Sequence, residues 1–173
     1  MISAQRTGLL RIACVLSLLP GLALAEQGGL TGRTVLFSVL TYDDPAVPIF
    51  IGRDYAANVV AGPEFGMVRE GTEGYDVVPV LVDLSDQRID LSYAQTPTGQ
   101  FASAAFNGYV LRFPTDCVLI GGAAIDAKAT TLPLTDADLI LTPQSLSINV
   151  AGHAFDQSTR VGVTLTVMDC PVS

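Results

Sequence analysis

The sequence has few of the residues that common catalytic and metal sites require. It has no tryptophan, a single histidine and three cysteines among 173 residues. It has no C-x-x-C, H-x-x-x-H or G-x-x-x-x-G-K pattern, which excludes the common zinc and nucleotide-binding signatures. No G-x-S-x-G elbow accompanies His153, so no hydrolase triad can be assembled from sequence motifs. We therefore expect a protein with no catalytic residues, no metal ligands and no bound cofactor.

Positive charge is also scarce. The chain has nine Lys and Arg against seventeen Asp and Glu, and its net charge is −8 at neutral pH. Arg6 and Arg11 lie in the leader described next, so the remainder has 9 − 2 = 7 basic residues and a net charge of −10. Such a surface repels the phosphates of nucleic acids. We therefore predict no nucleic-acid partner.

The N-terminal segment has the features of a secretory signal. Two arginines precede an apolar stretch from Ile12 to Leu24, and Ala23-Leu24-Ala25 is the small-residue pattern that a signal peptidase recognises. A proline and a glycine interrupt this stretch, and it is shorter than the roughly 20 apolar residues that span a bilayer. We predict that 1–25 is a cleaved signal peptide and that 26–173 forms one domain without a membrane span. The destination is then the periplasm or the extracellular space.

Two of the three cysteines remain after that cleavage. Exported chains with an even number of cysteines usually pair them, so we predict a disulfide between Cys117 and Cys170. The bond would close a loop of about fifty residues and stabilise the fold by roughly 4 kcal/mol in the chain-entropy model. The alternative, a nucleophilic cysteine, is disfavoured because the chain has a single histidine.

Alternating apolar residues predict strands. The alternation occurs at 35–40, 89–93, 146–150 and 161–167, and no helical periodicity of comparable length follows the leader. Clusters of Gly, Pro, Asn and Asp separate the apolar stretches at short intervals. This pattern predicts an all-β fold, an antiparallel two-sheet β-sandwich of the jelly-roll or immunoglobulin-like type.

The stretch Phe106-Asn107-Gly108-Tyr109 has more than one interpretation. Asn-Gly is the preferred pair of a two-residue hairpin turn, because both positions need positive φ, and apolar alternation flanks it at 101–105 and 109–113. We predict a turn at Asn107 and Gly108, or a bulge in one longer strand where Gly108 permits the close approach of another backbone. A ligand-binding role for Asn107 and Tyr109 is the alternative.

Acidic residues and tyrosines near irregular segments are the other candidates for a ligand site. The region 43–72 is rich in proline and glycine, and binding residues often lie in irregular segments on a rigid scaffold. Carboxylates near turns can bind calcium, although aspartate is also an ordinary turn residue. Exposed tyrosines can serve as platforms for glycans. The candidates are Tyr42, Asp43, Asp44, Tyr55, Asp136 and Asp138.

Three segments resemble a family of small secreted bacterial β-sandwich domains of unknown function. They are AGPEFGM at 61–67, FNGYVLRF at 106–113 and LTPQSLSINVAGHAFDQSTRVGVTLTV at 141–167. Members of that family often carry a C-terminal membrane-sorting helix, whereas this chain ends in Cys170-Pro-Val-Ser173. The resemblance implies export and a β-sandwich fold, and it brings no known activity.

Together these features predict an exported, non-enzymatic β-sandwich that binds an unidentified protein or glycan or has a structural role. A glycan-binding or calcium-dependent adhesion module is the alternative. A carboxylate-based hydrolase is a further one, because the separation of its two carboxylates cannot be obtained from sequence.

Overall fold

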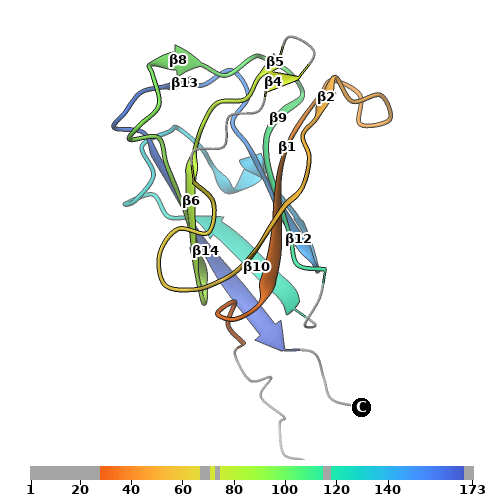
Figure 1. Cartoon of the computed structure of the whole chain (residues 1–173), viewed down its shortest axis with the longest axis vertical. Helices are drawn as coiled ribbons and strands as arrows, with labels where there is room; N and C mark the ends of the chain where they lie inside the picture. Colours follow the sequence, from red (N-terminus) through yellow and green to blue (C-terminus); the bar gives the residue numbers. More distant parts are fainter. Residues whose placement is uncertain (1–27, 67–70, 73–74, 115–117, 170–173) are drawn as a thin grey trace, which may run out of the picture.

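The computed structural model describes residues 28–66, 71–72, 75–114 and 118–169. Within these residues two antiparallel sheets pack against each other, which confirms the predicted all-β sandwich (Figure 1). No helix in the described part of the chain is long and apolar enough to cross a membrane.

The first sheet contains the long strands β1 and β9, which line the pocket described below. Its order is β11-β12-β9-β1-β2, and β3 also pairs with β1. All of its pairs are antiparallel. The strands are β1 (Thr34–Tyr42), β2 (Phe50–Ile51), β3 (Tyr55–Asn58), β9 (Phe106–Arg112), β11 (Leu139–Thr142) and β12 (Ser145–Asn149).

The second sheet faces the first and has the order β10-β14-β7-β6. Its strands are β6 (Leu81–Ser85), β7 (Arg88–Ser92), β10 (Val118–Ile125) and β14 (Arg160–Asp169). The short pairs β4 (Gly71–Thr72) with β5 (Tyr75–Asp76), and β8 (Gly99–Gln100) with β13 (Ala154–Phe155), lie near β2 at one end of the sandwich (Figure 1). A 3-10 turn, η1 (Asp136–Asp138), precedes β11.

The predicted alternation matches the observed burial. The four stretches at 35–40, 89–93, 146–150 and 161–167 lie in β1, β7, β12 and β14 or extend one residue beyond them. In β14 the inward residues are at most 5% exposed, while the intervening Thr164 and Thr166 face solvent. The inward residues of β14 are Val161, Val163, Leu165 and Val167. Burial of one face of each strand therefore builds a common core between the sheets.

The predicted turn at Asn107 and Gly108 is wrong. Both residues lie inside β9, whose register with β1 runs without interruption from Leu36↔Arg112 to Tyr42↔Phe106. Residues 101–105, the expected partner strand, form no strand. The hairpin rule fails here because β9 pairs with β1 and β12, which are distant in sequence, instead of with its own neighbour.

Gly108 instead satisfies a close contact between backbones. A Cβ atom at this position would lie 1.9 Å from the carbonyl oxygen of Ile148 in β12. No side chain can occupy that space, so glycine permits β12 to approach β9 at this point. The predicted bulge is absent, because the registers of β9 with β1 and β12 include Gly108 without a shift, but the close backbone approach that was expected with it is present.

Glu64 connects the segment after β3 to the edge of the second sheet by hydrogen bonds. Its Oε1 accepts a hydrogen bond from the Val60 N–H (2.9 Å), and its Oε2 accepts one from the Leu84 N–H in β6 (2.7 Å). Next to it, Phe65 forms a bridge with Val82 and stacks on Phe37 with ring centroids 5.1 Å apart. Glu64 and Phe65 of this segment therefore cover part of edge strand β6, and Phe65 adds an aromatic ring to the core.

The predicted signal peptide and both cysteines of the predicted disulfide lie outside the described residues. The described residues that adjoin the cysteines are Val118, at the start of β10, and Asp169, at the end of β14. These two residues are register partners. Each cysteine is therefore the sequence neighbour of one member of a cross-strand pair. The disulfide itself remains a prediction.

Candidate functional site

Two buried tyrosines lie between the sheets. Tyr93 follows β7, Tyr109 belongs to β9, and their hydroxyls are 3.1 Å apart and hydrogen-bonded. The Tyr109 ring lies 5.7 Å from Phe37 and 6.5 Å from Tyr93 between centroids, and Tyr93 also packs on Phe101 and Phe155. Burial raises the pKa of both tyrosines above the ordinary value, because the phenolate would be desolvated.

This pair should make the fold sensitive to alkaline pH. Each pKa is raised in the folded state, so its contribution to stability is fully present below the ordinary value of 10.0 and is lost as pH rises from there towards the folded pKa. With two protons released on unfolding, the free energy of unfolding should fall by up to about 2.7 kcal/mol per pH unit. Urea unfolding midpoints from about pH 8 to about pH 11 would measure this slope.

The matched control is the double variant Tyr93→Phe, Tyr109→Phe, which should lose most of that slope. An equal slope in the variant and the unmodified protein would contradict the assignment to this pair.

A pocket lies beside the packed rings of Tyr93, Phe101 and Tyr109, at the end of the sandwich near β2 and β8. Its volume is about 250 Å³. We call it the end pocket. Its lining residues are Val39, Thr41, Ile49, Phe50, Val77, Val78, Gln100, Phe101, Ala102, Ser103, Asn107, Gly108, Tyr109 and Val150.

Asn107 shapes one wall of the end pocket. Its Oδ1 accepts a hydrogen bond from the Thr41 hydroxyl on β1 (3.1 Å), and its Nδ2 donates to the Ala102 carbonyl (3.0 Å). Its backbone N–H donates to Asn149 Oδ1 (3.1 Å). Asn107 thus connects β1, β9, β12 and the loop after β8. Both ends of its side-chain amide make contacts within the protein, and these contacts fix this part of the wall.

The polar groups that remain at the end pocket come from the loop side. Gln100 donates through Nε2 to the Gly152 carbonyl (3.0 Å), and within the described residues its Oε1 has no hydrogen-bond partner. The Ser103 hydroxyl likewise has none there. No lining residue is Asp, Glu, Lys, Arg or His, and most of the lining side chains are apolar. The end pocket therefore presents a hydroxyl and an amide oxygen against uncharged walls.

Apolar side chains continue outward from the mouth of the end pocket. Ile49 lines the pocket and is 42% exposed, while Val47 and Ile51, which flank it in the chain, are 70% and 69% exposed. The segment 47–51 therefore offers matched positions for probing the pocket, because Ile49 contacts it and Ile51 does not line it.

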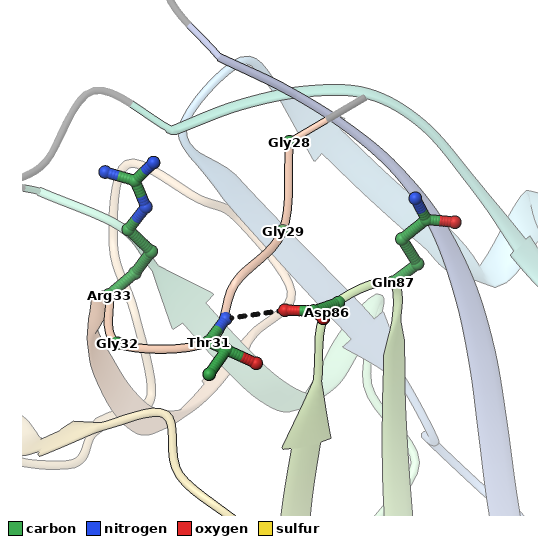
Figure 2. A pocket seen from close by; sticks show the side chains of 7 residues that line it. All are labelled: Gly28, Gly29, Thr31, Gly32, Arg33, Asp86 and Gln87. Atoms are coloured by element: carbon green, nitrogen blue, oxygen red, sulfur yellow. Dashed lines mark hydrogen bonds between the residues drawn. The ribbon is translucent and has the colours of Figure 1, made fainter. Parts of the chain in front are cut away.

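A second, more open depression of about 490 Å³ lies at the opposite end, between residues 28–33 and the turn that joins β6 to β7 (Figure 2). Asp86 Oδ1 accepts a hydrogen bond from the Thr31 N–H (3.0 Å), and hydrogen bonding by the Thr31 side chain and then its backbone lowers the Asp86 pKa. Figure 2 shows Arg33 and Gln87 extending away from Asp86 on opposite sides. The carboxylate is thus used to hold the N-terminal segment, and the depression gathers no converging side chains.

The predicted ligand residues near 43 have structural contacts. Asp44 accepts a hydrogen bond from the Ala46 N–H (2.9 Å), which is the contact of an ordinary turn residue. Asp43 accepts one from the Ala105 N–H (3.0 Å), and Tyr42 stacks on Phe106 with ring centroids 5.2 Å apart. These two residues therefore connect the end of β1 to the start of β9 and the residue before it.

The remaining candidates lie elsewhere and also have structural contacts. Asp136 accepts a hydrogen bond from the Ile125 N–H (2.7 Å), and Asp138 forms a capping box with Thr135. Tyr55 is half-buried under Arg53, whose guanidinium carbon is 4.7 Å from the ring centroid. The structure does not bring the six candidates together. No group of three or more His, Cys, Asp or Glu that could hold a metal occurs in 28–66, 71–72, 75–114 or 118–169.

Two of the sequence predictions coincide with the end pocket. One is the Asn107–Tyr109 segment, and the other is the irregular region 43–72, which contributes Ile49 and Phe50 to the lining. The sequence shows no motif at Gln100, Ser103 or Val150. These residues line the end pocket only because segments distant in the sequence pack together.

Comparison of the chain with protein-family models, curated proteins and solved structures found no match. The resemblance to secreted bacterial β-sandwich domains therefore remains a prediction from the three quoted segments.

Proposed function

We propose that the protein is an exported binding protein without catalytic activity and that the end pocket is its binding site. One observation carries the proposal: a pocket with mainly apolar walls has two exposed polar side chains in its lining, Gln100 and Ser103, which are accessible to a ligand. Ligand sites typically combine apolar walls with a few polar groups that fix orientation.

The chemistry of the lining supports binding in preference to catalysis. Tyr109 is the one titratable residue among those that line the end pocket, and its hydroxyl bonds to Tyr93 in the core. Its raised pKa disfavours a phenolate base near neutral pH. Export is supported by the N-terminal sequence pattern alone.

The glycan-binding and calcium-dependent alternatives have less support. Tyr42 packs on Phe106 instead of offering a free platform, and Asp43 and Asp44 already accept backbone hydrogen bonds. Neither function accounts for the end pocket.

A fragment screen by protein-observed NMR tests the proposal. The screen contains neutral, cationic and anionic fragments. We expect the fragments of one of these classes to bind and to shift the amide signals of Gln100, Asn107 and Tyr109. The variant Ile49→Asp places a charge at the pocket mouth and should abolish those shifts. Its matched control, Ile51→Asp, changes a more exposed neighbour and should retain them. Fragments that bind elsewhere, or shifts that persist in Ile49→Asp, would overturn the proposal.

A further inference from the structure

The dimensions of the end pocket limit the size of its ligand. The pocket holds about 250 Å³, below the roughly 300–1,000 Å³ of most ligand sites. An apolar protein cavity of about 150 Å³ binds benzene. The end pocket can therefore enclose one ring with a small substituent, but it cannot enclose a whole nucleotide or oligosaccharide.

The walls select against charge. A carboxylate or ammonium in the end pocket would lose hydration without gaining a countercharge, because no lining residue carries a full charge. Rings favour contact with other rings, and Phe50, Phe101 and Tyr109 supply aromatic faces or edges along the lining. A neutral ring matches both properties.

The polar groups add one requirement. Gln100 Oε1 can only accept a hydrogen bond, and the Ser103 hydroxyl can accept or donate. Gln100 is exposed, so its Oε1 is accessible to a ligand with a hydroxyl or N–H donor, which would form a hydrogen bond that a ligand without a donor cannot form. We propose, on the basis of the function proposed above, that the end pocket binds a free, neutral single-ring compound carrying one hydroxyl or N–H group, of the phenol type.

A matched set of probes tests this ligand class by isothermal titration. We expect p-cresol to bind about tenfold more tightly than toluene, which lacks the donor, and at least about tenfold more tightly than benzoate or benzylamine, which are charged. It should also bind more tightly than n-hexanol, which loses more conformational freedom on binding. Equal or tighter binding of a charged probe or of n-hexanol would overturn the proposal.

Variants separate the hydrogen bond from general packing. Gln100→Ala should reduce p-cresol affinity to the level of toluene while leaving toluene affinity unchanged. Gln144→Ala, at an exposed position between β11 and β12, is the control and should bind p-cresol normally. If Gln100→Ala still bound p-cresol more tightly than toluene, Gln100 would not be the hydrogen-bond acceptor. The proposal that the ligand needs a hydroxyl or N–H group would then be wrong.

Two outcomes distinguish this inference from the proposed function. If none of these probes binds but other fragments shift Gln100 and Tyr109, the ligand class is wrong and the binding function stands; if no fragment binds in the end pocket, both fail. Tighter binding of N-acetyl-tyrosine amide than of p-cresol would indicate a tyrosine side chain of a protein partner and would overturn the free compound as ligand.

Discussion

Replacing Gly108 with alanine should lower the free energy of unfolding by about 3 kcal/mol or more, at the upper end of what overpacking costs. The added Cβ atom would lie 1.9 Å from the Ile148 carbonyl oxygen, which belongs to a backbone that cannot rotate away. Strands β9 and β12 would have to separate, and the wall formed by Asn107 would move with them. Urea unfolding measures the loss, and titration with an end-pocket ligand measures the second effect.

Gly66→Ala is the control for this substitution. A Cβ atom at Gly66 would meet nothing within 4 Å, so the change in stability should stay within about 0.5 kcal/mol. Similar stability of Gly108→Ala and the unmodified protein would show that β12 does not approach β9 as described.

Replacing Cys117 and Cys170 with serine should cost about 4 kcal/mol of stability, because the unfolded chain would no longer be constrained by a closed loop of about fifty residues. The flanking residues Val118 and Asp169 are register partners, which is compatible with a bond between the adjoining positions. Urea unfolding of the oxidised protein and the double variant measures the difference.

The reduced, unmodified protein provides the matched comparison. Its stability should equal that of the double serine variant. Thiol alkylation in denaturant without reductant gives an independent measurement: modification of both cysteines in the protein as secreted would show that the bond does not form.

The sequence predicted β1, β7, β12 and β14 because their burial follows local alternation, whereas β6 and β10 were not among the predicted stretches. In β7, β12 and β14, every second residue points into one shared core, so the pattern can be recognised without knowing the partner strand. The two-residue strands β2, β8 and β13 were missed, since such strands are too short to show alternation and exist only through their pairing.

The error at Asn107 and Gly108 has the same physical origin. A hairpin requires its two flanking segments to pair, and the local sequence cannot show that β9 pairs with β1 and β12 instead. The end pocket was equally inaccessible to sequence reasoning, because Thr41, Phe50, Gln100 and Val150 come from four separate segments. Two predictions came nearest to it: the interpretation of Asn107 and Tyr109 as binding residues, and the expectation of a ligand loop in 43–72, which supplies Ile49 and Phe50.

The arrangement of the strands also determines how the protein can be attached to a surface. Gly28 donates a backbone hydrogen bond to Val167 near the end of β14, so the first and last described segments leave the sandwich together, at the end opposite β2 and β8 (Figure 1). A tether or reporter domain joined beyond either segment would therefore leave the end pocket facing solution. If the end pocket is the binding site proposed above, the protein could be immobilised through either terminal segment without covering that site.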